Sequence, residues 1–259
     1  MENDDTVKES LGKIVSNTSP NNSHLITVVG QGSRIEYKFE PEITAPEGCK
    51  YEIAFASMET YYSIPNITVG NNSFTIQKSG KDAKTFKLET GCYGLLDLNK
   101  EISIILKDHD MEGAIKLEPI YSTLKCAMTV KKGYTVKFAE HSLRKVLGFE
   151  AGKVYKSLVK DKRFVSEHIV KILTVNSIMV HCDLVEGSYL NGKKASIIYS
   201  FFPKAEPGFK IVKEPNQYIY LPVVSDVIRQ MSVWVTDQYQ YDLELLEENI
   251  TIKFHLKSC

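Results

Sequence analysis

The segment YEIAFASMETYYSIPNITVGNNSF, residues 51–74, contains the two signals on which the fold prediction rests. Its first nine residues alternate apolar with polar side chains, which is the pattern of a strand with one buried face. The corner that follows is stiff, because Pro65 fixes its own φ and holds the preceding residue extended. We expect Gly70 with Asn71 or Asn72 to supply the positive φ of a tight reversal. The segment therefore predicts a strand followed by a turn with architectural meaning.

The same alternation continues on both sides of this segment. HLITVVG and RIEYKFE precede it, and SFTIQK and TFKLE flank a lysine-containing turn and predict a hairpin. Nearer the C-terminus, KASIIYSFF, YIYLPVV, QMSVWVTD and NITIKFHL are enriched in β-branched and aromatic residues, as strands are. SIMVHCDLV is apolar at nearly every position, which predicts a strand covered on both faces.

Two short helices are predicted among the strands. Residues 94–108 have apolar residues at helical spacing, namely Leu95, Leu98, Ile102 and Ile105. Residues 140–149 predict a second helix, which Gly148 ends. About ten strands without a βαβ rhythm favour an all-β fold, a β-sandwich of two antiparallel sheets with a few short helices in its loops.

Domain organisation follows from the extent of this pattern. Residues 1–23 lack apolar periodicity and are rich in Ser, Asn and charge, so we expect a flexible N-terminal arm. Residues 24–259 show neither a composition break nor an internal repeat. We therefore expect them to form a single domain, which at this size can bury a full core.

The composition excludes some partners and leaves others open. The chain has 32 basic and 32 acidic residues, so its bulk charge predicts neither nucleic-acid nor membrane affinity, although a local basic patch remains open. No apolar run approaches the roughly 20 residues that span a bilayer. The N-terminal sequence has no signal-peptide-like apolar region, so we expect the five cysteines to be reduced thiols.

One stretch matches the spacing of a phosphate-binding loop. In GSYLNGKK, residues 187–194, Gly187, Gly192 and Lys193 fit G-x4-G-K. The motif also needs a Ser or Thr hydroxyl and a helix N-terminus. Lys194 takes the place of the hydroxyl, and the next element reads as a strand. An Asn-Gly turn in a β-hairpin is the better interpretation.

Other chemistry-bearing residues lack the partners that their chemistry requires. Cys92 precedes a predicted helix, but nothing ties His141 or His181 to it as a base. His109 lies between two aspartates without the spacing of a metal site. Trp234, between two valines, is either a core residue or an interface anchor. We expect no catalytic residues, no metal and no cofactor.

Six blocks, taken in order, carry a family resemblance. They are YEIAFASMETYYSIPNITVGNNSF, ETGCYGLLDLNKEI, VKFAEHSLRKVLGF, VNSIMVHCDLVEGSYLNGKKASIIYSFFPKAEPGFKIV, YIYLPV and MSVWVTDQYQYDLELLEENITIKFHLK. In this order they resemble the minor capsid (penton) proteins of Polinton or Maverick elements, adintoviruses and virophages. The resemblance covers residues 24–257.

The resemblance implies a structural role. Such a protein is expected to be a single jelly roll that forms homopentamers at the five-fold vertices of an icosahedral shell. Its expected partners are itself and a major capsid protein with a double jelly roll, with no specific nucleic acid and no membrane span. Its expected place is the virion, after synthesis in the cytoplasm or nucleus of the host cell. No enzyme activity is implied.

A closed pentamer is a ring in which one surface meets a different surface of the neighbour. It predicts exposed apolar and aromatic residues on an isolated subunit. The candidates are the aromatic residues of turn-rich segments: Tyr61, Tyr62, Tyr189, Phe209 and Tyr239. If a residue of this set is buried in the subunit's own core, its assignment to the interface is wrong.

Two other functions remain open from the sequence. A lectin-like sandwich, or an interaction module domesticated by a host, would need a concave pocket with convergent polar groups. A calcium-dependent version would need clustered acidic ligands, and no D-x-D-x-D run is present. An enzyme is disfavoured by the missing catalytic constellation. The longer loops, residues 150–169 and 203–216, are where contacts specific to one species are expected.

Overall fold

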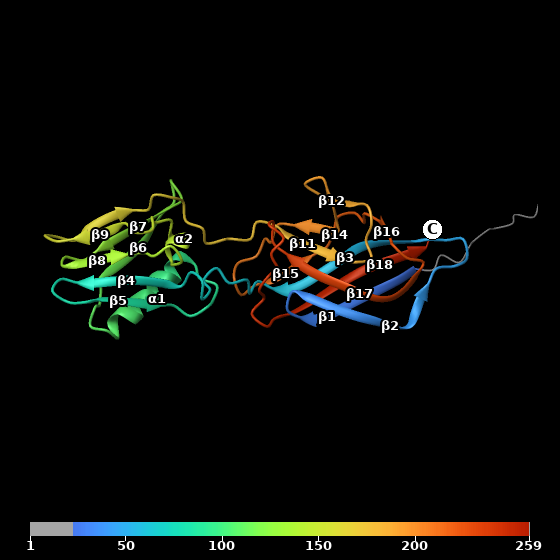
Figure 1. Ribbon diagram of the computed structural model, residues 1–259, viewed down its shortest axis with the longest axis horizontal. Coiled ribbons are helices and arrows are strands. Elements are labelled where there is room, and N and C mark those ends of the chain that lie inside the picture. The colour runs from blue at the N-terminus through green and yellow to red at the C-terminus, as the bar shows by residue number, and fades with distance from the viewer. Residues whose placement is uncertain (1–22, 259) are drawn as a thin grey trace, which may run out of the picture.

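The computed structural model describes residues 23–258. The expected arm, residues 1–23, therefore lies outside the described residues apart from Ser23, and Cys259 does too. The described chain forms two lobes side by side along the long axis of the molecule (Figure 1). One lobe contains the first three strands and the C-terminal part of the chain, and the other contains the middle of the chain.

The first lobe is a jelly roll. Its eight strands are β1 (Ser23–Gln31), β2 (Arg34–Thr44), β3 (Tyr51–Tyr61), β11 (Ile178–Cys182), β14 (Ile197–Phe201), β15 (Lys210–Lys213), β17 (Val227–Thr236) and β18 (Asn249–Ser258). One sheet has the order β1-β18-β3-β15 and the other β2-β17-β11-β14. When the eight strands are numbered along the chain, these orders are 1-8-3-6 and 2-7-4-5. The chain therefore crosses to the other sheet after every strand except the fourth, which is followed by the fifth in the same sheet. This is the connectivity of a jelly roll, so the expected fold class is confirmed.

Strand alternation explains why the two sheets pack. In β18 the residues Ile250, Ile252, Phe254 and Leu256 are all at most 1% exposed, and polar or half-buried side chains alternate with them. Their partners on the opposite sheet include Val233 and Val235, which are equally buried. Three short strands join this lobe: β16 (Leu221–Pro222) pairs with β3, and β12 (Ser188–Leu190) pairs with β13 (Lys193–Ala195).

The second lobe, which we call the insertion lobe, lies between β3 and β11 in the chain. Its elements are β4 (Ser73–Lys78), β5 (Ala83–Lys87), α1 (Leu95–Lys107), β6 (Ile115–Ile120), β7 (Lys125–Val130), β8 (Tyr134–Lys137), α2 (Arg144–Leu147), β9 (Val154–Ser157) and β10 (Lys162–Val165). They form an antiparallel sheet of order β5-β4-β8-β9 and a second of order β10-β7-β6. The predicted hairpin over SFTIQK and TFKLE is the β4–β5 pair.

Both predicted helices are present, and the second ends at Gly148 as predicted. In α1 the backbone N–H of Gly94 donates to Asp97 Oδ2 at 2.9 Å, and Leu98, Ile102 and Leu106 are buried. The second helix, α2, has only four residues and is followed by Gly148 with φ of 80°. A Cβ at Gly148 would lie 2.3 Å from the His168 carbonyl oxygen, so this turn requires glycine on two grounds.

A single domain over residues 24–259 is the expectation from the sequence, and the buried residues of the described chain form two clusters. One core joins residues 26–64 to residues 175–256, and a separate core is formed by residues 67–155. The reason is that residues 66–172 satisfy their own strand pairings and bury their own apolar faces. We propose that the two lobes are separate domains, since each has a core of its own.

The corner SIPNITVGNN is the passage from one lobe to the other. The Asn66 side chain donates to the carbonyls of Tyr93 and Ile172 at 2.7 and 3.0 Å, and accepts from the Tyr93 N–H at 2.9 Å. Because Ile172 lies where the chain leaves the insertion lobe, Asn66 ties the two connecting segments together. The positive φ expected at Gly70, Asn71 or Asn72 is wrong. The turn is held instead by the Asn71 side chain, whose Oδ1 accepts from the Thr68 N–H at 2.8 Å.

Candidate functional site

The five predicted interface residues divide into four that are exposed and one that is not. The exposed fractions are 48% for Tyr61, 63% for Tyr189, 64% for Phe209 and 69% for Tyr239. Tyr62 is only 4% exposed and belongs to the jelly-roll core, so its prediction as an interface residue is wrong. Burial raises the pKa of its hydroxyl. Tyr61 and Tyr62 are neighbours in the chain, and adjacent residues of an extended segment face opposite sides.

Three of the exposed residues lie at the end of the jelly roll that faces the insertion lobe. Tyr61 is the last residue of β3, and the N–H of Tyr62 donates to the carbonyl of Phe209 at 2.8 Å. This bond holds the segment that carries the Tyr61 ring beside the segment that carries the Phe209 ring. Tyr239 lies in the β17–β18 loop, which the Gln238 side chain fastens to the N–H of Asn176 at 2.9 Å. Tyr189 lies apart from these residues, on the β12–β13 hairpin that projects from the side of the sandwich (Figure 1).

Two further exposed residues, not among those predicted from the sequence, lie in the β17–β18 loop. Tyr241 is 72% exposed and Leu246 is 39% exposed. The Asp237 carboxylate accepts from the N–H groups of both Tyr239 and Tyr241, at 2.7 and 3.0 Å, so the two tyrosines project from one fixed turn. The signal in the sequence was the aspartate followed by alternating tyrosines. We call the set Tyr61, Phe209, Tyr239, Tyr241 and Leu246 the junction-end surface.

A shallow cavity separates part of this surface from the insertion lobe. Its volume is about 370 Å³, and its lining includes Tyr61, Leu246 and Cys92. The Cys92 thiol donates to the Ile64 carbonyl at 3.1 Å, and burial raises the pKa of that thiol. A cysteine nucleophile needs the opposite shift. Cys92 therefore closes the junction by packing and hydrogen bonding.

Trp234 lies on the outer face of the sheet β2-β17-β11-β14, since its neighbours Val233 and Val235 point into the core. It is half-buried. Its ring stacks on His181 with centroids 4.9 Å apart, and the guanidinium carbon of Arg34 lies 4.7 Å above it. His181 is 4% exposed, and burial lowers its pKa to about 4. Its ring nitrogen Nε2 is 2.9 Å from the Thr236 hydroxyl, so this histidine is a neutral, packed residue.

The stretch with phosphate-loop spacing is a hairpin, as predicted. Residues 188–190 pair with residues 193–195, and Asn191 and Gly192 have φ of 51° and 80°. These values are those of a two-residue primed turn. No helix N-terminus follows the turn, so the backbone cannot cradle a phosphate as that motif does.

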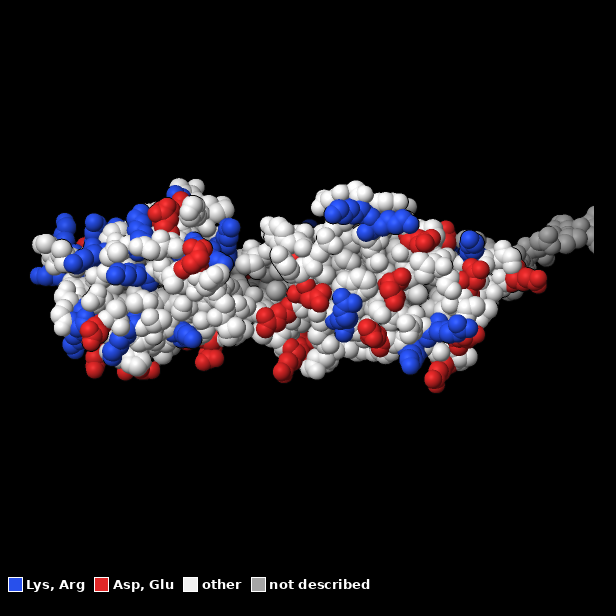
Figure 2. All heavy atoms as spheres, in the orientation of Figure 1, with Lys and Arg blue, Asp and Glu red and all other residues white. Residues whose placement is uncertain are grey.

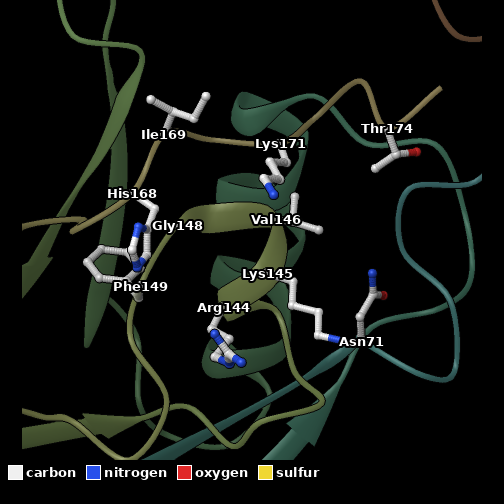
Figure 3. Close-up of a pocket in the computed structure, with 10 residues that line it drawn as sticks. All are labelled: Asn71, Arg144, Lys145, Val146, Gly148, Phe149, His168, Ile169, Lys171 and Thr174. Carbon is white, nitrogen blue, oxygen red and sulfur yellow. The ribbon is translucent and has the colours of Figure 1, made fainter. Parts of the chain in front are cut away.

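A groove in the insertion lobe has a basic lining. It has a volume of about 430 Å³ and lies between α2 and the segment 168–174 (Figure 3). The ammonium of Lys145 points toward Asn71, and that of Lys171 toward Val146. Arg144 is paired with Glu140, which lies outside the lining set. The cationic groups do not converge on one point, and the lining contains no carboxylate or thiol.

Within residues 23–258, no set of three or more His, Cys, Asp or Glu side chains is grouped as a metal ion would require. Neither helix of that part of the chain has the length and apolar character needed to span a bilayer. Cys49, Cys92, Cys126 and Cys182 are free thiols.

Solved structures similar to this chain include the following three. The mavirus penton protein aligns with a TM-score of 0.49 and 11% identity, over 92% of this chain and 100% of that chain. The D1-D2-D3 domains of the flagellar cap protein FliD from Escherichia coli align with a TM-score of 0.24 and 11% identity, over 83% of this chain and 57% of that chain. Its D2-D3 domains give the same TM-score and identity, over 83% of this chain and 100% of that chain.

No protein-family model matches the sequence, and no curated protein does. At 11% identity and TM-scores below 0.5, the jelly-roll assignment depends on the strand connectivity described above and not on these likenesses.

Proposed function

We propose that this protein is a structural minor capsid (penton) protein that forms homopentamers at the five-fold vertices of an icosahedral virus-like shell. The observation that carries the proposal is the jelly-roll order of the eight strands, which occurs in a chain whose sequence blocks resemble this class of protein. The class in question is that of Polinton or Maverick elements, adintoviruses and virophages. The protein then acts in the virion, beside a major capsid protein with a double jelly roll.

The exposed aromatic residues support an assembling surface. A ring of identical subunits needs two different patches that fit each other. The junction-end surface groups five large side chains at one end of the sandwich, and Tyr189 adds one on a separate hairpin. Aromatic residues are enriched at the cores of protein interfaces, and tyrosine contributes strongly because it buries a large area at little cost in side-chain entropy.

Native mass spectrometry over a range of protein concentrations and ionic strengths tests the proposal. We expect a species of five 29.3 kDa subunits. The double variant Tyr61→Ser with Phe209→Ser is expected to weaken it, since truncation of a central aromatic contact commonly costs about 2 kcal/mol or more. The matched control is Tyr121→Ser, because Tyr121 is 79% exposed but lies in the β6–β7 turn of the insertion lobe.

A second arm of the experiment covers assembly that needs the partner. The chain is co-expressed with the major capsid protein of the same element, and pentamers are sought at the vertices of any shells. A monomer at all concentrations, together with shells that do not incorporate the chain, would contradict the proposal. It would favour the alternative of a ligand-binding or host-domesticated sandwich.

A further inference from the structure

The neutral net charge of the chain conceals two lobes of opposite sign. Residues 66–172 contain 19 Lys and Arg and 12 Asp and Glu, a net charge of +7. The jelly-roll lobe, residues 23–65 and 173–258, contains 11 Lys and Arg and 16 Asp and Glu, a net charge of −5. The positive charge of the insertion lobe attracts polyanions to that end of the molecule, although the chain as a whole has no net charge.

The positive charge of the insertion lobe is concentrated at the end that lies farthest from the jelly roll. Three turns meet there: residues 78–82, 131–133 and 157–162, which we call the distal turns. The Ser79 N–H donates to the Gly133 carbonyl at 2.7 Å, and the Gly133 N–H donates to the Ser157 carbonyl at 2.8 Å. These bonds join the three turns into one surface, and Lys and Arg side chains gather at this end in Figure 2.

The distal turns carry six lysines and two aspartates. The lysines are Lys78, Lys81, Lys131, Lys132, Lys160 and Lys162. The Asp161 carboxylate already accepts from the Lys132 N–H at 2.8 Å, and Glu112 lies in a neighbouring turn. None of the ion pairs within residues 23–258 involves a lysine of the distal turns. These ammonium groups are therefore free of carboxylate partners in that part of the chain.

The apex of this surface is apolar. Leu158 and Val159 stand in the bend between β9 and β10 and are 60% and 81% exposed. The bend is held by the Ser157 hydroxyl, which donates to the Lys160 carbonyl. Both aliphatic residues at the tip of this turn are mostly exposed in the subunit, and lysines surround them. Exposed aliphatic side chains beside unpaired lysines are typical of protein surfaces that bind at the interface of a membrane.

We propose that the distal turns dock on the surface of an anionic lipid bilayer. The lysine ammonium groups would contact lipid phosphates and carboxylates, and Leu158 and Val159 would enter the boundary between headgroups and acyl chains. Single-stranded nucleic acid is a poorer match, because the two rings beside the distal turns are not open for stacking: Tyr134 is buried, Phe164 is half-buried, and a lysine of the turns lies over each. This inference concerns the insertion lobe and does not depend on the proposed function of the jelly roll.

Co-sedimentation of the full chain with vesicles tests the proposal. One set of vesicles is phosphatidylcholine alone, and the other contains phosphatidylcholine and phosphatidylserine at a ratio of about 2:1. The ionic strength is about 0.05 M, where screening is weak. We expect binding only to the anionic vesicles, and loss of that binding as salt is added.

Two variants separate the charged from the apolar contribution. Lys131→Gln with Lys132→Gln should weaken binding about 25-fold, at about fivefold for each lysine. Leu158→Ser with Val159→Ser should weaken it about tenfold or more. The matched controls are Lys193→Gln with Lys194→Gln, in the jelly-roll hairpin, and Tyr121→Ser with Leu124→Ser, at the other end of the same lobe. Both controls should bind like the unaltered chain.

Three results would overturn the proposal. The first is no binding to the anionic vesicles at low salt. The second is binding that the lysine variant leaves unchanged. The third is binding to heparin or single-stranded DNA that is as tight as binding to vesicles, together with an unchanged affinity of the Leu158 and Val159 variant for all three ligands. The surface would then recognise polyanions in general. Far-ultraviolet circular dichroism of each variant confirms that the fold is retained.

Discussion

The jelly roll and the insertion lobe differ in how far apart their paired strands lie in the chain. In the jelly roll β1 pairs with β18, so that Ser23 lies opposite Lys257, and β2 pairs with β17. In the insertion lobe most pairs are local, β4 with β5, β6 with β7 and β8 with β9, and the most distant pair, β4 with β8, places Thr75 opposite Lys137. Loop closure costs entropy before distant strands gain from pairing, so local pairings form faster. The comparison teaches that the insertion lobe can complete its own structure before the jelly roll closes around its two connections.

The largest expected effect tests whether the two cores are independent. Phe254 in the jelly roll and Phe149 in the insertion lobe are both 0% exposed. Replacing either residue by Ala should cost about 3–5 kcal/mol, because it removes a buried ring and leaves a cavity. We expect Phe254→Ala to speed amide hydrogen exchange in β3 and β18 but not in β7, and Phe149→Ala to do the reverse. Equal acceleration in both lobes by either variant would show that they unfold as one unit.

An intermediate effect is expected from pH and should be confined to the jelly roll. Burial lowers the pKa of His181 to about 4, whereas an unfolded histidine titrates near 6.5. Stability contributed by the neutral ring is therefore complete above about pH 6.5. It falls as the pH drops toward 4, because the unfolded state then binds the proton more readily. The total loss is about 3 kcal/mol at most.

Urea unfolding at pH 7 and pH 4.5 measures this effect. The fluorescence of Trp234, the single tryptophan, reports on the jelly roll alone, since its ring stacks on His181. Replacement of His181 by Phe should flatten the dependence between these two pH values. A dependence that survives in that variant would assign the acid sensitivity to other groups.

The smallest of these effects concerns the connection between the lobes. Replacement of Asn66 by Ala removes three hydrogen bonds and leaves the N–H and carbonyl of Tyr93 and the carbonyl of Ile172 without that partner. We expect a cost of about 2 kcal/mol. Exchange should accelerate at the amides of residues 91–93 and 172–174, while β7 and β18 remain protected. Asn216→Ala, at an exposed asparagine of the β15–β16 loop, is the control and should change nothing measurable.

Much of the strand and helix content could be predicted from the sequence because periodicity reports which faces are buried. The helix α1 and the β12–β13 hairpin follow from apolar spacing and from an Asn-Gly turn. Periodicity does not report what covers a buried face. SFTIQK suits a strand of a sandwich as well as it suits β4 of a second core, so the division into two lobes was not visible.

The candidate surfaces show the same limit at the level of single residues. Tyr61 and Tyr62 are chemically alike, and only the register of β3 against β15, where Tyr61 lies opposite Lys210, decides which ring faces solvent. The basic distal turns come from three segments about 25 to 50 residues apart, so the neutral total of the chain gave no indication of them. Long-range pairing, which short motifs do not encode, produced both features.

The hydrogen bonds of Asn66 mark a position at which another domain could replace the insertion lobe. Because the segment that enters the insertion lobe and the one that leaves it are held within a single hydrogen bond, the jelly roll needs only a short bridge at this position to remain connected. An unrelated module whose own ends lie together could be spliced in for residues 67–171 without stretching β3 or β11. The sandwich would then act as a carrier that displays a chosen module.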